Sequence, residues 1–141
     1  MILLDTDTLT HFSYGKNPKL RNRIEQVPDD EILAITVITY YEVLRGRGEN
    51  LLKAADKQQL QQATLRFQQA QKLLAKFPVL HFDDQSIEKF SLLRNQKTLN
   101  KMGRADLLIA SIALANNALL VTRNLKDYRN IANLQVENWV D

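Results

Sequence analysis

Four acidic side chains stand at positions where a carboxylate could do chemistry: Asp5, Glu42, Asp106 and Asp127. Asp5 directly follows the apolar run Ile-Leu-Leu, and Asp106 opens an almost wholly apolar helical segment. Carboxylates without nearby histidine or cysteine are the ligands of a hard cation, so this set predicts Mg²⁺ or Mn²⁺. Such a cation relieves the repulsion between close carboxylates. It can also polarise a phosphodiester and activate water.

Each of these acids also has a purely structural interpretation. Asp5 can cap the helix that begins after it, and Asp106 can interact with the dipole of its own helix. Glu42 can form an ion pair with an arginine, and Asp127 can form a surface pair. The basic residues available are Arg45 and Arg104 for Glu42, and Lys126 and Arg129 for Asp127. Taken one at a time, the four acids are therefore compatible with either a chemical or a structural role.

Basic side chains near these acids could contact an anionic substrate. Arg104 lies two residues before Asp106, and Arg123 follows the last predicted core strand. Both are candidates for contacting a substrate phosphate, a kind of contact that gives affinity without reading sequence. For the basic positions from Lys89 to Lys97, a solvated helix face is the alternative.

The elements that must position these residues alternate between strands and helices. The predicted strands are 2–4, 32–35, 79–82, 118–121 and 134–136, and the predicted helices are 6–14, 19–27, 37–44, 50–77, 83–97 and 104–117. This alternation predicts an α/β fold with a mostly parallel central sheet flanked by helices. Ligands of such sheets bind beyond the carboxyl ends of the strands, which is where the acids fall.

The helices carry two further predictions. Thr36 caps the helix that begins at Val37, and Gly46 and Gly48 end it. In the segment 50–77, apolar residues recur at spacings of three and four, which is typical of a helical seam. This seam packs on the same domain or forms a partner surface. Its members are Leu60, Ala63, Phe67, Ala70, Leu74 and Phe77.

Composition narrows the class of protein. The chain has 141 residues, which predicts a single domain over 1–141. It has no cysteine, which excludes disulfides and suits a reducing cytoplasm. The first residues lack a basic leader and a long apolar run, so we expect neither a signal peptide nor a membrane span. The net charge of +3 is compatible with a nucleic-acid partner.

Five motifs in order give the chain a family resemblance. They are ILLDTDTL at the start, ITVITYYEVLRG at 35–46, GRADLLIASIAL at 103–114, LLVTRNLKDYRNI at 119–131 and LQVENW at 134–139. Together they resemble a PIN-domain ribonuclease, in particular the VapC-type toxins of toxin–antitoxin pairs. The resemblance spans nearly the whole chain and implies a PIN-like three-layer fold.

The resemblance implies an endoribonuclease dependent on Mg²⁺ or Mn²⁺, with an RNA substrate, a cognate antitoxin protein and a homodimeric state. It implies an acidic core of Asp5, Glu42 and Asp106, in which Asp5 and Asp106 are direct metal ligands. Glu42 would bind the metal through water or act on the attacking water. Some PIN domains carry a fourth acid where this chain has Asn124. Asp127 is the available substitute, and Asn124 could orient a ligand or a water.

Two other functions remain open from the sequence. ILLDTDTL also matches the start of haloacid-dehalogenase-like phosphatases, in which Asp5 would be the nucleophile. That class leaves Glu42 and the Asp106 helix unexplained. A PIN-like module that binds RNA or a partner without cutting is the second alternative. It is disfavoured because all three core acids are present.

Overall fold

A five-stranded parallel sheet forms the centre of the computed structural model, which describes residues 1–141. The strands are β1 (Ile2–Leu4), β2 (Leu33–Thr36), β3 (Val79–Leu80), β4 (Leu119–Val121) and β5 (Gln135–Glu137). Their order is β3-β2-β1-β4-β5, and every neighbouring pair is parallel. The chain moves outward from β1 to β3 and then returns to β4 on the other side of β1. This reversal creates a topological switch point between β1 and β4, where ligands of such folds bind.

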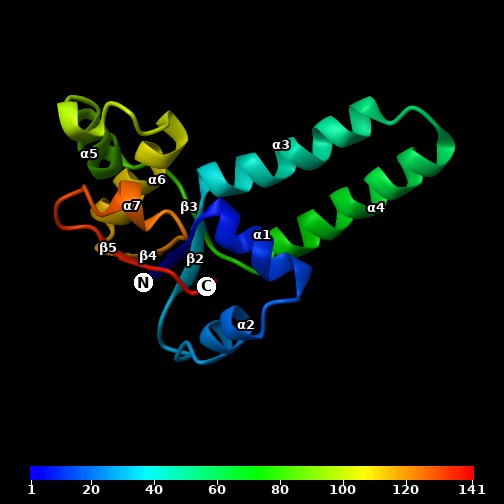
Figure 1. Ribbon diagram of the computed structural model, residues 1–141, viewed down its shortest axis with the longest axis horizontal. Coiled ribbons are helices and arrows are strands. Elements are labelled where there is room, and N and C mark those ends of the chain that lie inside the picture. The colour runs from blue at the N-terminus through cyan, green and yellow to red at the C-terminus, as the bar shows by residue number, and fades with distance from the viewer.

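Seven α-helices surround the sheet (Figure 1). They are α1 (Thr6–Tyr14), α2 (Pro18–Glu25), α3 (Val37–Lys53), α4 (Lys57–Leu74), α5 (Asp84–Arg94), α6 (Arg104–Ala115) and α7 (Leu125–Tyr128). One 3₁₀ turn, Lys97–Leu99, lies between α5 and α6. Strands alternate with helices as the sequence predicts, and most predicted bounds lie within three residues of these.

Successive residues of the strands face opposite sides of the sheet, and each side has its own apolar core. Leu3 and Leu120 pack with α6 on one side. Leu4 and Val121 pack on the other side with residues of α1, α2 and α4, such as Leu9 and Leu74. The molecule is therefore a three-layer structure of helices, sheet and helices. This confirms the predicted α/β architecture.

The largest difference from the sequence prediction concerns α3. Thr36 caps this helix as predicted, because its Oγ1 accepts a hydrogen bond from the Thr39 amide at 3.2 Å. The predicted end at Gly46 and Gly48 is wrong, since the helix continues to Lys53. Neither glycine adopts a positive φ, so neither forms the left-handed cap that ends a helix. Packing along α4 outweighs the low helix propensity of glycine here.

α3 and α4 form a helical hairpin that extends away from the sheet (Figure 1). The predicted seam on α4 faces into the molecule, and Ala63, Ala70 and Leu74 are buried. Phe67 is half-buried and packs near Gly48 of α3. Only the outer end is open, where Leu60 is 49% exposed. The protein's own helices thus cover most of the seam.

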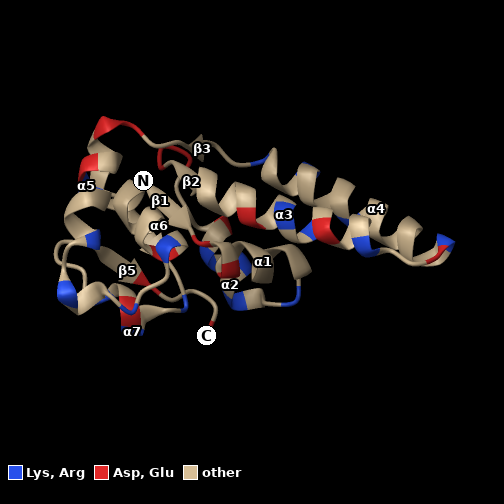
Figure 2. Ribbon diagram, turned by 90° about the horizontal axis from the view of Figure 1, so that it is seen from above, with Lys and Arg blue, Asp and Glu red and all other residues tan.

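Two smaller observations complete the fold. The predicted strand 79–82 is shorter in the structure, and His81 is exposed and lies just beyond β3. No helix combines the length and the apolar character that crossing a membrane requires. Figure 2 shows basic and acidic positions on both the sheet-containing body and the α3–α4 hairpin.

Candidate active site

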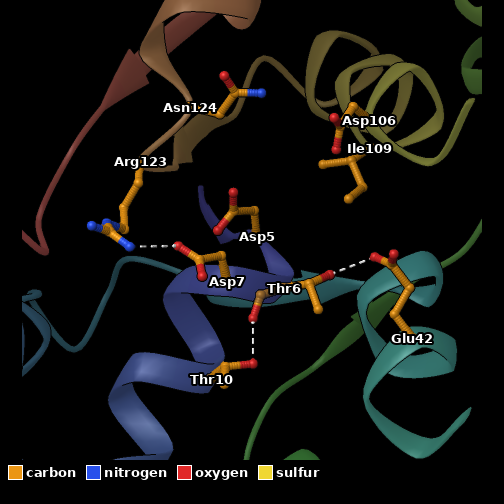
Figure 3. Close-up of a pocket in the computed structure, with 9 residues that line it drawn as sticks. All are labelled: Asp5, Thr6, Asp7, Thr10, Glu42, Asp106, Ile109, Arg123 and Asn124. Carbon is orange, nitrogen blue, oxygen red and sulfur yellow. Dashed lines mark hydrogen bonds and ion pairs between the residues drawn. The ribbon is translucent and has the colours of Figure 1, made fainter. Parts of the chain in front are cut away.

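A pocket lies at the carboxyl ends of β1 and β4, at the switch point of the sheet (Figure 3). Three of the predicted acids line it: Asp5 from the end of β1, Glu42 from α3 and Asp106 from the first turn of α6. Residues more than a hundred positions apart in sequence therefore meet in one place. The complete lining is Asp5, Thr6, Asp7, Thr10, Glu42, Asp106, Ile109, Arg123 and Asn124.

Asp5 combines its structural and chemical interpretations. Its Oδ1 accepts a hydrogen bond from the Thr8 amide at 2.8 Å and so caps α1. The side chain is only 8% exposed, and this burial raises the pKa of Asp5, although hydrogen bonds from Thr122 and Thr8 act in the opposite direction. Asp5 therefore caps α1 and lines the pocket at the same time.

Glu42 is held by a neighbouring hydroxyl rather than by an arginine. Thr6 Oγ1 donates to Glu42 Oε1 at 2.6 Å, which fixes the carboxylate over the pocket. Neither predicted ion pair forms. Arg45 pairs with Glu49 at 3.0 Å, and the guanidinium of Arg104 lies 4.9 Å from the centre of the Phe90 ring. The carboxylate of Glu42 consequently has no cationic partner within the protein.

Asp106 is the third residue of α6, whose body is apolar on nearly every side. Leu107, Ile109 and Ala110 are buried against the sheet, and this packing fixes the direction of the first turn. Partial burial raises the pKa of Asp106. The negative charges of Glu42 and Asp127 raise this pKa further, while the Tyr128 hydroxyl, which lies near Asp106 without forming a hydrogen bond of acceptable geometry, opposes the shift. An apolar helix thus holds a carboxylate where other carboxylates repel it.

Asn124 and Asp127 occupy different positions relative to the pocket. Asn124 lines it, whereas Asp127 lies behind and accepts a hydrogen bond from Asn124 Nδ2 at 3.1 Å. Asp127 therefore orients the amide, and its charge reaches Asp106 through space.

Of the two predicted phosphate-contacting arginines, the structure brings only Arg123 to the pocket. Arg123 forms ion pairs with Asp7 at 3.6 Å and with Asp141 at 3.2 Å. Arg104 instead stacks on Phe90.

Sequence reasoning missed several residues of the site. Thr6, Thr10 and Ile109 line the pocket. Helical periodicity gives a signal for two of them, because Thr10 lies four residues after Thr6 and Ile109 three residues after Asp106, and positions one turn apart share a helix face. Tyr128 was also missed. Its side chain is 1% exposed, and its hydroxyl has no hydrogen-bond partner. Burial raises the pKa of Tyr128 far above its usual value, and the charges of Asp106, Asp5 and Glu42 act in the same direction.

The chemistry of the pocket suits a hydrated hard cation. No three His, Asp or Glu side chains are gathered closely enough to form a ready-made metal site. Mg²⁺, however, keeps several waters and commonly binds through one or two carboxylates. Asp5 and Asp106 supply such oxygens, and their raised pKa values show the cost of leaving them uncompensated.

Residues 2–134 match the sequence model of the PIN domain family. The chain belongs to the PIN-domain family. This membership favours the nuclease interpretation over the phosphatase alternative.

Two relatives of this PIN domain match along nearly their whole length. It is 31% identical over 140 residues to Ribonuclease VapC2 of Rickettsia felis, covering 97% of this chain and 96% of the relative. It is 28% identical over 141 residues to Ribonuclease VapC1 of Haemophilus influenzae strain R2866, with the same coverage.

Solved structures show the same fold. VapBC2 from Rickettsia felis, bound to a DNA fragment from its promoter, contains a chain with a TM-score of 0.79 and 27% identity, covering 99% of both chains. VapBC-1 from nontypeable Haemophilus influenzae contains one with a TM-score of 0.80 and 27% identity, covering 100% of both. The PIN-like three-layer architecture is thereby confirmed.

Proposed function

We propose that this PIN domain is an endoribonuclease that depends on Mg²⁺ or Mn²⁺ and serves as the toxin of a toxin–antitoxin pair. The observation that carries the proposal is the meeting of Asp5, Glu42 and Asp106 at one pocket on the switch point of the sheet. The ribonuclease names of its relatives support the reaction class.

Asp5 and Asp106 would hold the cation, with Glu42 bound to it through water. When bound, the cation polarises the scissile phosphodiester and lowers the pKa of a coordinated water. Glu42, fixed by Thr6 at 2.6 Å, orients the attacking water and accepts its proton. Asn124, held by Asp127, positions a further ligand or water through its amide. Arg123 contacts a substrate phosphate by exchanging its exposed pairs with Asp7 and Asp141, and Arg104 is a weaker candidate for this role.

The proposal includes three assignments for the whole protein. The chain acts as a single domain over 1–141, in the cytoplasm. It forms a complex with a cognate antitoxin, as the solved VapBC relatives suggest. It also forms a homodimer, for which exposed apolar residues such as Tyr41 and Leu92 offer contact area.

The decisive test uses the purified chain and a fluorescently labelled RNA in the presence of excess MgCl₂. Asp5→Asn and Asp106→Asn should each lower the cleavage rate by about a hundredfold or more, because loss of even a supporting residue costs about 10–100-fold at such sites. The double variant should lose little more, since both groups serve one metal site. Asp29→Asn, in an exposed loop, is the matched control.

A fully active, folded Asp106→Asn variant would contradict the assignment of the site. A folded parent protein that binds RNA but never cleaves it would support the alternative of a non-catalytic RNA-binding or partner-binding module. Expression in a growing host adds a second readout. The parent should arrest growth, the Asp106→Asn variant should not, and co-expression of the antitoxin gene should restore growth and give a complex that co-purifies.

A further inference from the structure

A second cleft lies beside the candidate active site, between α1 and the α3–α4 hairpin. Four basic side chains line it: Arg47 from α3, Arg66 and Lys72 from α4, and Lys76 just after α4. No acidic side chain lines the cleft. Arg66, Lys72 and Lys76 are exposed and Arg47 is half-buried, so their charges face the solvent side of the cleft. Basic positions on both helices of the hairpin are visible in Figure 2.

The four cations have no partners within the protein. None of them takes part in an ion pair, whereas Arg23, Arg45 and Arg123 each pair with a carboxylate. Four like charges close together repel one another, which favours an anionic occupant that neutralises them. The cleft is therefore complementary to a ligand with several negative charges.

The cleft adjoins the candidate active site. Thr10 of α1 lines both of them. α1 begins at Thr6 in the catalytic pocket and ends at Tyr14 in the cleft. At about 1.5 Å per residue this is a path of about 12 Å. An extended chain held at the catalytic acids can therefore follow α1 directly to the four cations.

An exposed aromatic ring stands at the far end of this path. Tyr14 is 58% exposed, and its ring packs edge-on against His11 with the centroids 6.4 Å apart. An aromatic ring next to a basic groove is the usual arrangement for single-stranded nucleic acid, because bases stack on the ring while cations follow the backbone. An acidic peptide would use the cations but would have no base to stack.

We propose that this cleft binds the backbone phosphates of single-stranded RNA beside the scissile bond, with one base stacked on Tyr14. The proposal rests on the ribonuclease function proposed above and extends it to the path of the substrate. Contacts of this kind fix the register of the strand and carry no base information. The cleft therefore raises affinity for any single strand, and recognition of sequence belongs to other residues.

The experiment measures RNA binding as a function of salt. The probe is a fluorescein-labelled single-stranded RNA 12-mer of mixed sequence, and all proteins carry Asp106→Asn to prevent cleavage. The test variant combines Lys72→Gln with Lys76→Gln. The matched control combines Lys53→Gln with Lys57→Gln, which removes the same charge from the outer tip of the same hairpin. Thermal melts verify that both variants are folded.

The slope of log K against log salt should become shallower by about 1.4 in the test variant, since each lost contact to a single strand contributes about 0.7. By the same relation, its affinity at 0.1 M salt should fall by about 25-fold. The control should keep nearly the parent slope. Arg66→Gln alone should change the slope by about 0.7, and Tyr14→Ala should weaken binding without changing the slope. Without the Asp106 substitution, the test variant should show a raised KM and an unchanged kcat.

Three results would overturn the inference. The first is that the parent is active and the test variant keeps the parent slope; the ribonuclease function would then still stand. Another is an equal loss in the control variant, which would show a general charge effect. The third is that binding of a polyglutamate 12-mer requires Lys72 and Lys76 whereas binding of the RNA does not require them. That result would make the cleft a protein-docking surface. A folded parent that neither binds nor cleaves RNA would instead refute the proposed function itself.

Discussion

Asp5 shows how one carboxylate can serve the fold and the site together. Its Oδ1 caps α1, so the side chain is fixed before any ligand arrives. Its burial raises its pKa, so the charged form is costly until a cation compensates it. The helix cap thus supplies orientation, and burial supplies the affinity for a positive charge. Asparagine is an equally good N-cap, which makes Asp5→Asn a variant that removes charge and keeps the helix.

Tyr128 leads to a prediction about stability. Its hydroxyl is buried without a hydrogen-bond partner, and an unsatisfied buried polar group costs about 1–3 kcal/mol. In metal-free protein, Tyr128→Phe should therefore raise the free energy of unfolding by about 1 kcal/mol. Urea denaturation at neutral pH with a chelator measures this. Tyr14→Phe, at a side chain 58% exposed, should change stability by less than about 0.5 kcal/mol.

The opposite outcome would be informative. A loss of more than about 1 kcal/mol in Tyr128→Phe would mean that the hydroxyl donates to Asp106 in solution, since a hydrogen bond to a charged group is worth about 1.5–3 kcal/mol. That result would contradict the unpaired state of this hydroxyl.

The residues of the site differ in how far the sequence predicts them. The sequence predicts Asp5, Glu42 and Asp106 because Asp5 follows a strand end, Asp106 opens a helix and Glu42 lies in the helix after the second strand. Those positions meet near one edge of a parallel sheet. The bond from Thr6 to Glu42 spans 36 positions, and no local pattern encodes it. The same holds for Tyr128, whose apolar surroundings form only when α7 packs on the core.

Among the elements, α3 shows where sequence patterns fail. Gly46 and Gly48 predict a helix end because glycine is costly in a helix interior. Burial along the α3–α4 contact decides the outcome, and periodicity within α3 alone does not reveal its partner helix. The alternation of strands and helices was a stronger signal, because a parallel sheet requires a crossover between successive strands.

The two glycines give a prediction for α3. An added Cβ at Gly46 meets nothing within 4 Å, and at Gly48 it lies 3.8 Å from Phe67 Cε2, an ordinary contact. Gly46→Ala and Gly48→Ala should each raise the free energy of unfolding by about 0.5–1 kcal/mol, because alanine is the better helix former. Chemical denaturation measures the change.

Gly15→Ala is the matched control for this prediction. Gly15 has a φ of 66° and closes α1 in the left-handed conformation, so an added Cβ is strained there and should destabilise the protein. If Gly46→Ala lowers stability instead, α3 is not continuous through residue 46 in solution.

At the scale of the whole molecule, the order of the strands creates the site. β1 lies at the centre of the sheet, with β2 and β4 on its two sides, so residues following β1 and β4 face a common crevice. α3 and α6 then bring Glu42 and Asp106 to the same crevice from the flanking layers. The packed core holds these carboxylates together against their repulsion. The folded state should therefore be less stable when they are ionised and no cation is present.

That cost should appear in the pH dependence of stability. Asp5 and Asp106 have raised pKa values in the folded protein, so the folded state binds more protons than the unfolded state between about 3.8 and those raised values. Their favourable contribution is complete below about 3.8 and is lost as pH rises through the folded pKa. Asp83 and Asp141 have lowered pKa values and act in the opposite direction, in the range below about 3.8.

Comparison of the parent with Asp106→Asn isolates this effect. In a chelator, the free energy of unfolding of the variant minus that of the parent should become more positive from pH 4 to pH 7. The parent loses stability over this pH range because Asp106 ionises, whereas the asparagine of the variant has no charge to gain. Addition of MgCl₂ at pH 7 should then stabilise the parent by about 2.7 kcal/mol at a hundredfold excess over Kd and leave the variant almost unchanged. A difference that is constant with pH, or an equal gain from Mg²⁺ in both proteins, would mean that Asp106 and the cation do not share one site.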